Sequence, residues 1–168
     1  MLKPNDWLNV SEGKDSMALT AEDRLGIQEL IYLYCVYADM DVAGRKAWNE
    51  LFEPDGQWIA QTAQLRTRED FTKHSERPPK GPSQANAQHW CTNTVIKEGK
   101  DGEAEVRSDV LVLQGNKEEG TARVTFMGTY EDIVHKVDGR WKFKLRTMKK
   151  ENIKMVSGGI QELFRPEQ

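Results

Sequence analysis

Two residues with acid–base side chains, Asp41 and His89, lie in different local settings and could act together. Asp41 ends a long helical pattern, and three residues precede it at three- and four-residue spacing on one helical face: Leu30, Tyr34 and Tyr37. His89 lies within a strand-like run. A carboxylate that accepts the imidazole N–H fixes the tautomer and makes the ring a better base. If the fold brings the two together in an apolar pocket, the chain carries a proton-transfer site.

Helical patterns fill the first half of the chain. Thr20 and Asp23 form a capping-box signature, which predicts that a helix begins there, and the apolar stripe predicts that this helix runs to Asp41. A similar signature begins a later, shorter helix. The expected helices cover 20–41, 47–52, 67–75 and, from a weaker pattern, 153–164.

Strand patterns dominate from residue 86 onward. The expected strands cover 57–60, 88–97, 105–113, 121–135 and 141–147. Helices followed by an antiparallel meander predict an α+β fold. We expect a curved, mostly antiparallel sheet wrapped over about three N-terminal helices, with an apolar pocket between them.

The composition predicts one soluble, globular domain over 19–168, preceded by a polar, flexible arm over 1–18. The chain has 168 residues, 38% of them hydrophobic and 30% charged, and a net charge of −3. This charge gives no electrostatic case for binding nucleic acid or an anionic membrane. No apolar run is long enough to span a bilayer, and the N-terminus lacks the apolar core of a secretion signal. A cytoplasmic location is therefore expected.

The cysteines and histidines predict no metal site. Cys35 and Cys91 are the only cysteines, and neither they nor the three histidines show the spacing of metal ligands. Free thiols are expected, and no cofactor is predicted.

Side chains along a strand alternate between the two faces of a sheet, so the parity of each residue assigns its face. Cys91 and Asn93 share the face of His89. One face of the next strand is small and apolar with one hydroxyl, which suits a pocket wall. The expected substrate contacts are Tyr34, Tyr37, Cys91, Asn93, Ser108, Val110, Val112, Phe126 and Tyr130. Arg146 has two open roles, a surface ion pair or a contact to a substrate oxygen.

The other face of the sheet predicts self-association. Its apolar residues, Leu111, Leu113, Phe143 and Leu145, cannot all be covered by helices that already lie on the first face. We therefore expect a homodimer or homotrimer that buries part of this face.

Over about residues 20–150 the chain resembles the SnoaL-like group of the nuclear-transport-factor-2-like (NTF2-like) superfamily. The members that it most resembles are scytalone dehydratase and hexachlorocyclohexane dehydrochlorinase. The resemblance rests on the order and spacing of Asp41, His89 and the segments 51–56, 109–111, 128–130 and 138–143. It implies the cone-shaped NTF2-like fold.

In those two enzymes the matching Asp and His form a catalytic dyad that works without cofactor or metal. The resemblance therefore implies that His89 removes a carbon-bound proton and that Asp41 orients it and stabilises the imidazolium. It also places Trp58 and Arg146 at pocket-lining positions. Met40 stands where scytalone dehydratase has a Tyr, and Val36 where the dehydrochlorinase has a Lys. The leaving group and the reaction subtype are therefore open.

The favoured function is a cofactor-independent lyase of the dehydratase type, or an isomerase, acting on a small apolar, aromatic or cyclic substrate. One alternative is hydrolase or polyketide-cyclase chemistry in the same pocket. Others are a non-catalytic ligand-binding protein and the small subunit of a ring-hydroxylating dioxygenase, since the fold serves these roles too.

Overall fold

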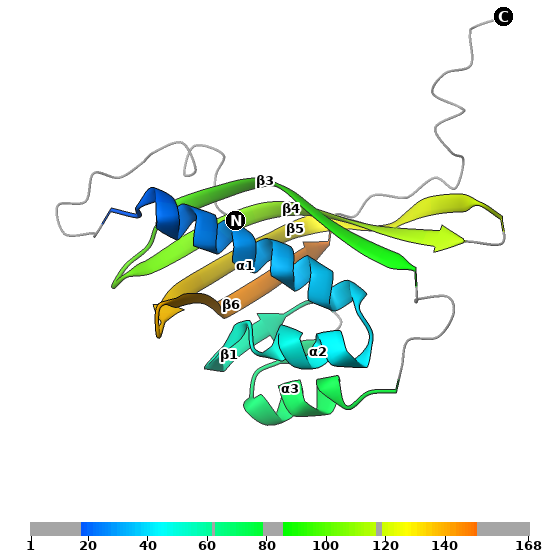
Figure 1. Ribbon diagram of the computed structural model, residues 1–168, viewed down its shortest axis with the longest axis horizontal. Helices are drawn as coiled ribbons and strands as arrows, with labels where there is room; N and C mark the ends of the chain where they lie inside the picture. The colour runs from blue at the N-terminus through cyan, green and yellow to red at the C-terminus, as the bar shows by residue number, and fades with distance from the viewer. Residues whose placement is uncertain (1–17, 62, 79–85, 117–118, 151–168) are drawn as a thin grey trace, which may run out of the picture.

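The computed structural model describes residues 18–61, 63–78, 86–116 and 119–150. Nearly all of the expected arm over 1–18, and the expected helix over 153–164, lie outside these ranges. Figure 1 shows an α+β fold in which a long helix lies across one face of a curved sheet and two short helices lie beside one edge. The predicted fold class is confirmed. None of the described helices is long and apolar enough to cross a membrane.

The longest helix, α1 (Ala21–Asp39), begins where the sequence predicts and ends earlier. The Thr20 side chain accepts from the Asp23 backbone N–H, and the Asp23 carboxylate accepts from Thr20 in return, which completes the capping box. The helix ends at Asp39 because Met40 has extended backbone, with ψ 162°. Asp41 is instead the N-cap residue of the next helix, so the prediction that the first helix runs to Asp41 is wrong.

Two short helices follow α1. Helix α2 (Val42–Asn49) packs against α1, and α3 (Arg68–Ser75) packs against α2. A second complete capping box, between Thr67 and Asp70, begins α3 as predicted.

Within the described residues the sheet has six strands, in the order β2-β1-β6-β5-β4-β3. They are β1 (Phe52–Ile59), β2 (Gln64–Leu65), β3 (Ala87–Glu98), β4 (Glu103–Asn116), β5 (Thr121–Val137) and β6 (Arg140–Lys150). All neighbouring pairs are antiparallel except β1 and β6. The strands after residue 86 match the predicted meander, whereas β2 was not predicted and β1 begins at Phe52, inside the predicted second helix.

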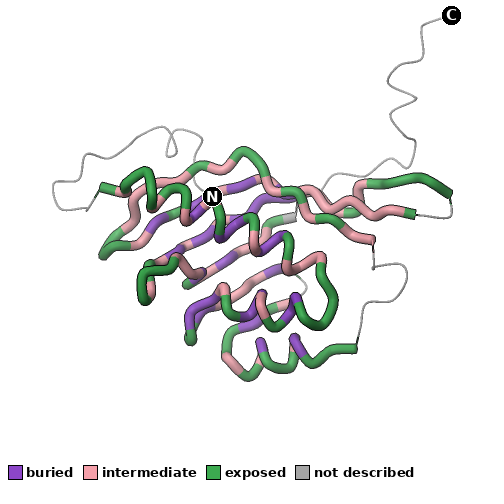
Figure 2. Tube along the Cα trace, viewed as in Figure 1, coloured by how far each residue is buried: buried purple, intermediate pink, exposed green. Residues whose placement is uncertain are grey.

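Buried residues concentrate where β4 to β6 pass behind α1 and where α2 and α3 meet β1 (Figure 2). An aromatic cluster fills the second of these places. Tyr34 contacts the rings of Trp48, Phe52 and Phe143, with centroids 5.3, 6.4 and 5.7 Å away. These contacts fix α1 against β1 and β6.

Two irregularities in strand pairing reverse the face of residues that were assigned by simple alternation. The register between β3 and β4 shifts between Thr92 and Val95, and that between β5 and β6 shifts between Ile133 and Val134. Phe143 lies opposite Val134, fully buried, so its predicted place on the outer face is wrong. A bulge inserts one unpaired residue, and every assignment beyond it changes parity.

Candidate active site

His89 pairs with the carboxylate of Asp39. The ring Nδ1 lies 2.6 Å from Asp39 Oδ1, and the His89 backbone N–H donates to Asp39 Oδ2 at 2.8 Å. Both carboxylate oxygens therefore hold the same residue, one by its ring and one by its main chain. The two side chains are 22% and 23% exposed, so a small molecule can reach the pair.

The sequence-based pairing of His89 with Asp41 is corrected by this geometry. Asp41 lies two residues beyond Asp39, and its carboxylate pairs with Arg45 of its own helix at 3.2 Å. The Asp41 side chain is 50% exposed. An Asp–His pair is present, but its carboxylate comes from the last residue of α1.

A second helical stripe explains why Asp39 is the partner. Ile27, Ile31 and Cys35 recur at four-residue spacing and are buried, and Asp39 continues this series. Cys35 Sγ contacts Cys91 Sγ at 3.2 Å, four residues before Asp39 and two after His89. Four helical residues advance about 6 Å and two strand residues about 6.6 Å. The contact between Cys35 and Cys91 therefore brings Asp39 level with His89. The four-residue spacing that leads to Asp39 is visible in the sequence and could have identified this partner.

The hydrogen bonds assign the tautomer of His89. A carboxylate accepts but does not donate, so the proton of the Nδ1···Oδ1 contact belongs to the ring. The lone pair of the neutral ring then lies on Nε2. This is the arrangement in which an imidazole can take up a proton while a carboxylate balances the resulting charge.

An apolar row extends from His89 across the sheet. Val112 lies opposite His89 on β4, and Phe126 lies opposite Val112 on β5. A Cβ on Gly128 would lie 2.9 Å from Phe126 Cζ and 2.3 Å from a backbone oxygen, so the Phe126 ring uses the space that this glycine leaves. His89 thus lies at the end of an apolar strip. An enclosed pocket at this place stays a prediction.

Arg146 lies in a second acid–base cluster and not on the surface. Its Nε and Nη2 donate to Asp132 at 2.8 and 2.7 Å, and both side chains are 0% exposed. The guanidinium carbon lies 4.0 Å from the ring centre of Tyr34 and 4.1 Å from that of Tyr130. The predicted surface ion pair is therefore a buried one, clamped between aromatic rings.

Part of this second cluster is left without hydrogen bonds. Arg146 Nη1 and Ser108 Oγ are buried and make none with any residue that the structure describes. The Tyr34 hydroxyl accepts from Trp58 Nε1 at 2.9 Å. Burial raises the pKa of Tyr34 and of Tyr130, so both phenols remain protonated at neutral pH.

Asn93 does not share the face of His89. It lies at the β3 bulge with φ 51° and is exposed, and its amide donates to Asp109 Oδ2 at 2.8 Å. The bulge moves Asn93 to the outer face, so its predicted position is corrected. The remaining predicted contacts lie in or against the core: Tyr34, Ser108, Val110 and Tyr130 are fully buried, and Tyr37, Trp58, Cys91, Val112 and Phe126 are half-buried.

No group of three or more His, Cys, Asp or Glu side chains within the described ranges could hold a metal ion. The acid–base and nucleophilic side chains at this site include the Asp39–His89 pair and the two thiols beside it.

Comparisons with known proteins place this geometry in a family. The model of the SnoaL-like domain matches residues 19–147. A sequence comparison with curated proteins returned no match. Among solved structures, a candidate scytalone dehydratase from Novosphingobium aromaticivorans is similar, with 26% identity and a TM-score of 0.61, over 77% of this chain and 85% of that one.

Two further structures share the fold. ActVI-ORFA from Streptomyces coelicolor has 16% identity and a TM-score of 0.67, over 77% of this chain and 98% of that one. The beta subunit of a candidate aromatic-ring-hydroxylating dioxygenase from Novosphingobium aromaticivorans has 16% identity and a TM-score of 0.60, over 78% and 90%. The chain belongs to the SnoaL-like family and has the NTF2-like, cystatin-like fold.

Proposed function

We propose that the protein is a cofactor-independent lyase of the dehydratase type, or an isomerase, with Asp39 and His89 as its catalytic dyad. One observation carries the proposal: a single carboxylate holds the ring Nδ1 and the backbone N–H of His89, at 2.6 and 2.8 Å. A purely structural histidine needs no such double restraint. The restraint fixes both the tautomer and the direction of the ring.

In the proposed reaction His89 Nε2 removes a proton from a substrate carbon. In an elimination, the electron pair of the broken C–H bond forms a C=C bond, and the leaving hydroxide takes the proton from His89 to become water. In an isomerisation, His89 returns the proton to a different carbon. In both, the Asp39 carboxylate balances the imidazolium charge. General acid–base catalysis of this kind contributes about 10²–10⁴-fold.

The substrate is a small apolar molecule, aromatic or cyclic. The apolar strip of Val112 and Phe126 beside His89 supports this class, because flat apolar walls bind ring systems and leave water out. The likeness to a candidate scytalone dehydratase supports the dehydratase type.

A non-catalytic role is the second candidate function, and the shared fold of the dioxygenase beta subunit favours it. Hydrolase or cyclase chemistry in the same site is a further alternative. The roles differ in their use of the dyad, since a structural subunit or a carrier needs no proton transfer at His89.

Proton exchange into substrate carbon tests the proposal whatever the leaving group is. A panel of cyclic and aromatic ketones and alcohols is incubated in D₂O, and deuterium incorporation and elimination products are followed by mass spectrometry. We expect His89→Ala and Asp39→Asn to lower the rate by about 10²–10⁴-fold. Asp41→Asn is the matched control and should leave the rate within about twofold, because Asp41 pairs with Arg45.

Two outcomes would contradict the proposal. Turnover that survives His89→Ala would remove this residue as the base. Stoichiometric binding of panel compounds, with neither exchange nor product, would favour the carrier.

A further inference from the structure

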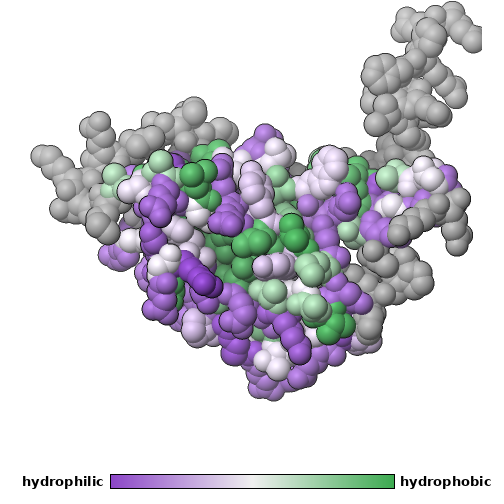
Figure 3. Space-filling model, viewed as in Figure 1, coloured by the Kyte–Doolittle hydropathy of each residue, from purple (hydrophilic) through white to green (hydrophobic). Residues whose placement is uncertain are grey.

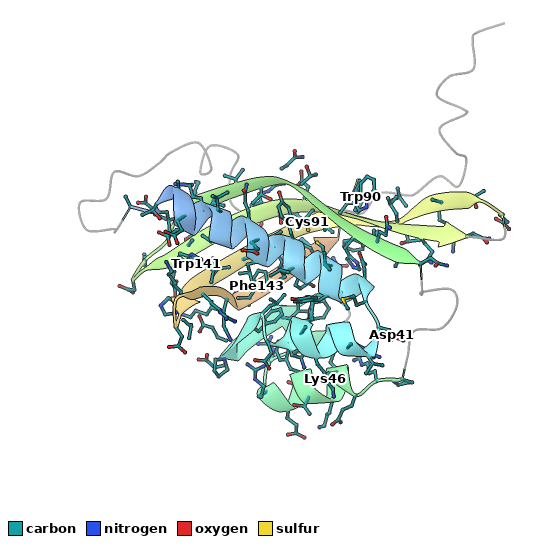
Figure 4. All side chains as sticks on the ribbon, viewed as in Figure 1. Asp41, Lys46, Trp90, Cys91, Trp141 and Phe143 are labelled. Atoms are coloured by element: carbon teal, nitrogen blue, oxygen red, sulfur yellow. The ribbon has the colours of Figure 1, made fainter. Side chains whose placement is uncertain are left out.

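The two cysteines of the chain meet beneath α1. Cys35 on α1 and Cys91 on β3 are 56 residues apart in sequence, and their sulfur atoms lie 3.2 Å apart as free thiols. Figure 4 shows the labelled Cys91 on the strand beside α1. Cys35 is 6% exposed and Cys91 is half-buried. A chain with only two cysteines has placed them against each other at an interior helix–strand contact.

The surroundings make the two thiols unequal. The Cys35 thiol donates a hydrogen bond to Cys91 Sγ, which lowers the pKa of Cys91, and the Arg146 cation lowers it further. The same hydrogen bond and burial raise the pKa of Cys35. Cys91 is therefore the more readily ionised sulfur, and a thiolate is the form that attacks oxidants.

We propose that Cys35 and Cys91 are a redox-active dithiol, which hydrogen peroxide closes to a disulfide that links α1 to β3. The proposal is independent of the proposed function, because it needs only the two sulfur atoms and their neighbours. A small oxidant suits the site, since neither thiol is fully exposed.

The chemistry balances in two steps. The Cys91 thiolate attacks one oxygen of hydrogen peroxide, the O–O bond breaks, and Cys91 sulfenic acid forms while the released hydroxide takes up a proton to become water. The Cys35 sulfur then attacks the Cys91 sulfur, the S–O bond breaks, and the departing hydroxide takes the Cys35 proton to become water. In sum, two thiols and one peroxide give one disulfide and two waters.

The site needs little movement to close. A disulfide holds its sulfurs about 2.05 Å apart, so the pair must approach by about 1.1 Å from its present contact. The bond would tie together segments 56 residues apart, which lowers the entropy of the unfolded chain. The disulfide would lie one helical turn from Asp39 and two strand residues from His89. Oxidation would therefore also hold α1 and β3 in the arrangement that brings Asp39 and His89 together.

Thiol counting on the full chain tests the proposal. The protein is reduced, freed of reductant and treated with one equivalent of hydrogen peroxide. We expect free thiols to fall from two to none, the mass to fall by about 2 Da, and a Cys35–Cys91 peptide to appear on mapping. The melting temperature should rise by about 10 °C and return on reduction.

Single variants separate the two sulfur roles. In Cys35→Ser we expect Cys91 to stop at the sulfenic acid, which dimedone traps, with no rise in melting temperature. In Cys91→Ser the remaining thiol should stay reduced at the same dose. The proposal is overturned if the wild-type protein keeps both thiols, if Cys91 proceeds to sulfinic acid, or if the disulfide joins two chains.

Discussion

The Asp39–His89 pair and the Asp132–Arg146 pair each join a carboxylate to a nitrogen base, but they differ in access to solvent. The first pair is about one-fifth exposed, and its base is an imidazole, a side chain that can take up and release a proton. The second is 0% exposed and contains a base that stays charged, clamped between rings. Access and a movable proton suit the first pair to chemistry, whereas burial and a fixed charge suit the second to holding the sheet in register.

The largest stability effect should follow from breaking the buried pair. Asp132→Asn leaves the Arg146 cation buried with a neutral partner, and we expect the free energy of unfolding to fall by about 3–5 kcal/mol. Urea titration measures this. A loss under 1 kcal/mol would mean that solvent reaches the pair, and the contrast between the two clusters would fail.

His74 is a third base, and because its ring is partly buried we expect it to have an intermediate effect on the free energy of unfolding. Its ring centre lies 5.1 Å from that of Trp48, and burial, with repulsion from Arg77 and Arg45, lowers its pKa to about 4. The folded protein thus holds this ring neutral, whereas the unfolded chain protonates it below about pH 6.5. The stability it contributes is present above that pH and falls as pH drops toward about 4.

The variant His74→Gln isolates this pH dependence. Between about pH 7.5 and pH 5 the wild-type protein should lose about 1 kcal/mol more unfolding free energy than the variant, after allowance for partial exposure of the ring. Urea titrations of both proteins at the two pH values give the change in unfolding free energy with pH for each. Equal changes in the two proteins would show that His74 is as free to protonate in the folded protein as in the unfolded chain.

Asp39→Asn should have a smaller effect on stability than Asp132→Asn, although it removes the same charge. An amide has one accepting oxygen, so it can accept from only one of the two His89 groups that the carboxylate holds. The pair is also partly solvated, and we expect a loss of about 1 kcal/mol. Differential scanning calorimetry of the two variants side by side measures the difference in their loss of stability. A loss for Asp39→Asn as large as that for Asp132→Asn would make the first pair structural.

The two faces of the molecule allow a similar comparison, and we propose that the outer sheet face carries a homodimer or homotrimer contact. Trp90 is 56% exposed there, beside Leu111 and, one strand further, Met127. On the opposite side, shown in Figure 3, apolar side chains also reach the surface over the helices, and Val36 of α1 is 54% exposed.

Charged substitutions on the two faces distinguish them with almost no effect on protomer stability. Trp90→Lys should convert the oligomer to a monomer in light scattering, whereas Val36→Lys should leave it assembled, and both should change unfolding of the protomer by about 0.5 kcal/mol or less. A wild-type monomer at micromolar concentration, or dissociation by Val36→Lys alone, would contradict the proposed interface.

The sequence predicted the fold well because its signals are local. Capping boxes at Thr20 and Thr67 marked two helix starts, and alternating strands after residue 86 marked the meander. The two-residue strand β2 was missed because it is too short to show a period.

The site was predicted less well because a shift of one or two residues in a helical or strand pattern changes which side chains meet. The sequence shows two helical stripes that lead to an Asp, one to Asp41 and one to Asp39. The stripe that passes through Ile31 and Cys35 leads to Asp39, the last residue of α1, whereas Asp41 lies beyond the helix end. Bulges moved Asn93 outward and Phe143 inward, which strict alternation cannot foresee. The Asp132–Arg146 pair depends on register across two strands, which no single segment of the sequence encodes.

The direct test of the central claim, that Asp39 sets the tautomer of His89, is ¹⁵N NMR of the neutral form of the His89 ring. We expect its proton to lie on Nδ1 in the wild-type protein and in Asp41→Asn, and this single tautomer to be lost in Asp39→Asn. An unchanged His89 spectrum in Asp39→Asn, or one altered only by Asp41→Asn, would contradict the account.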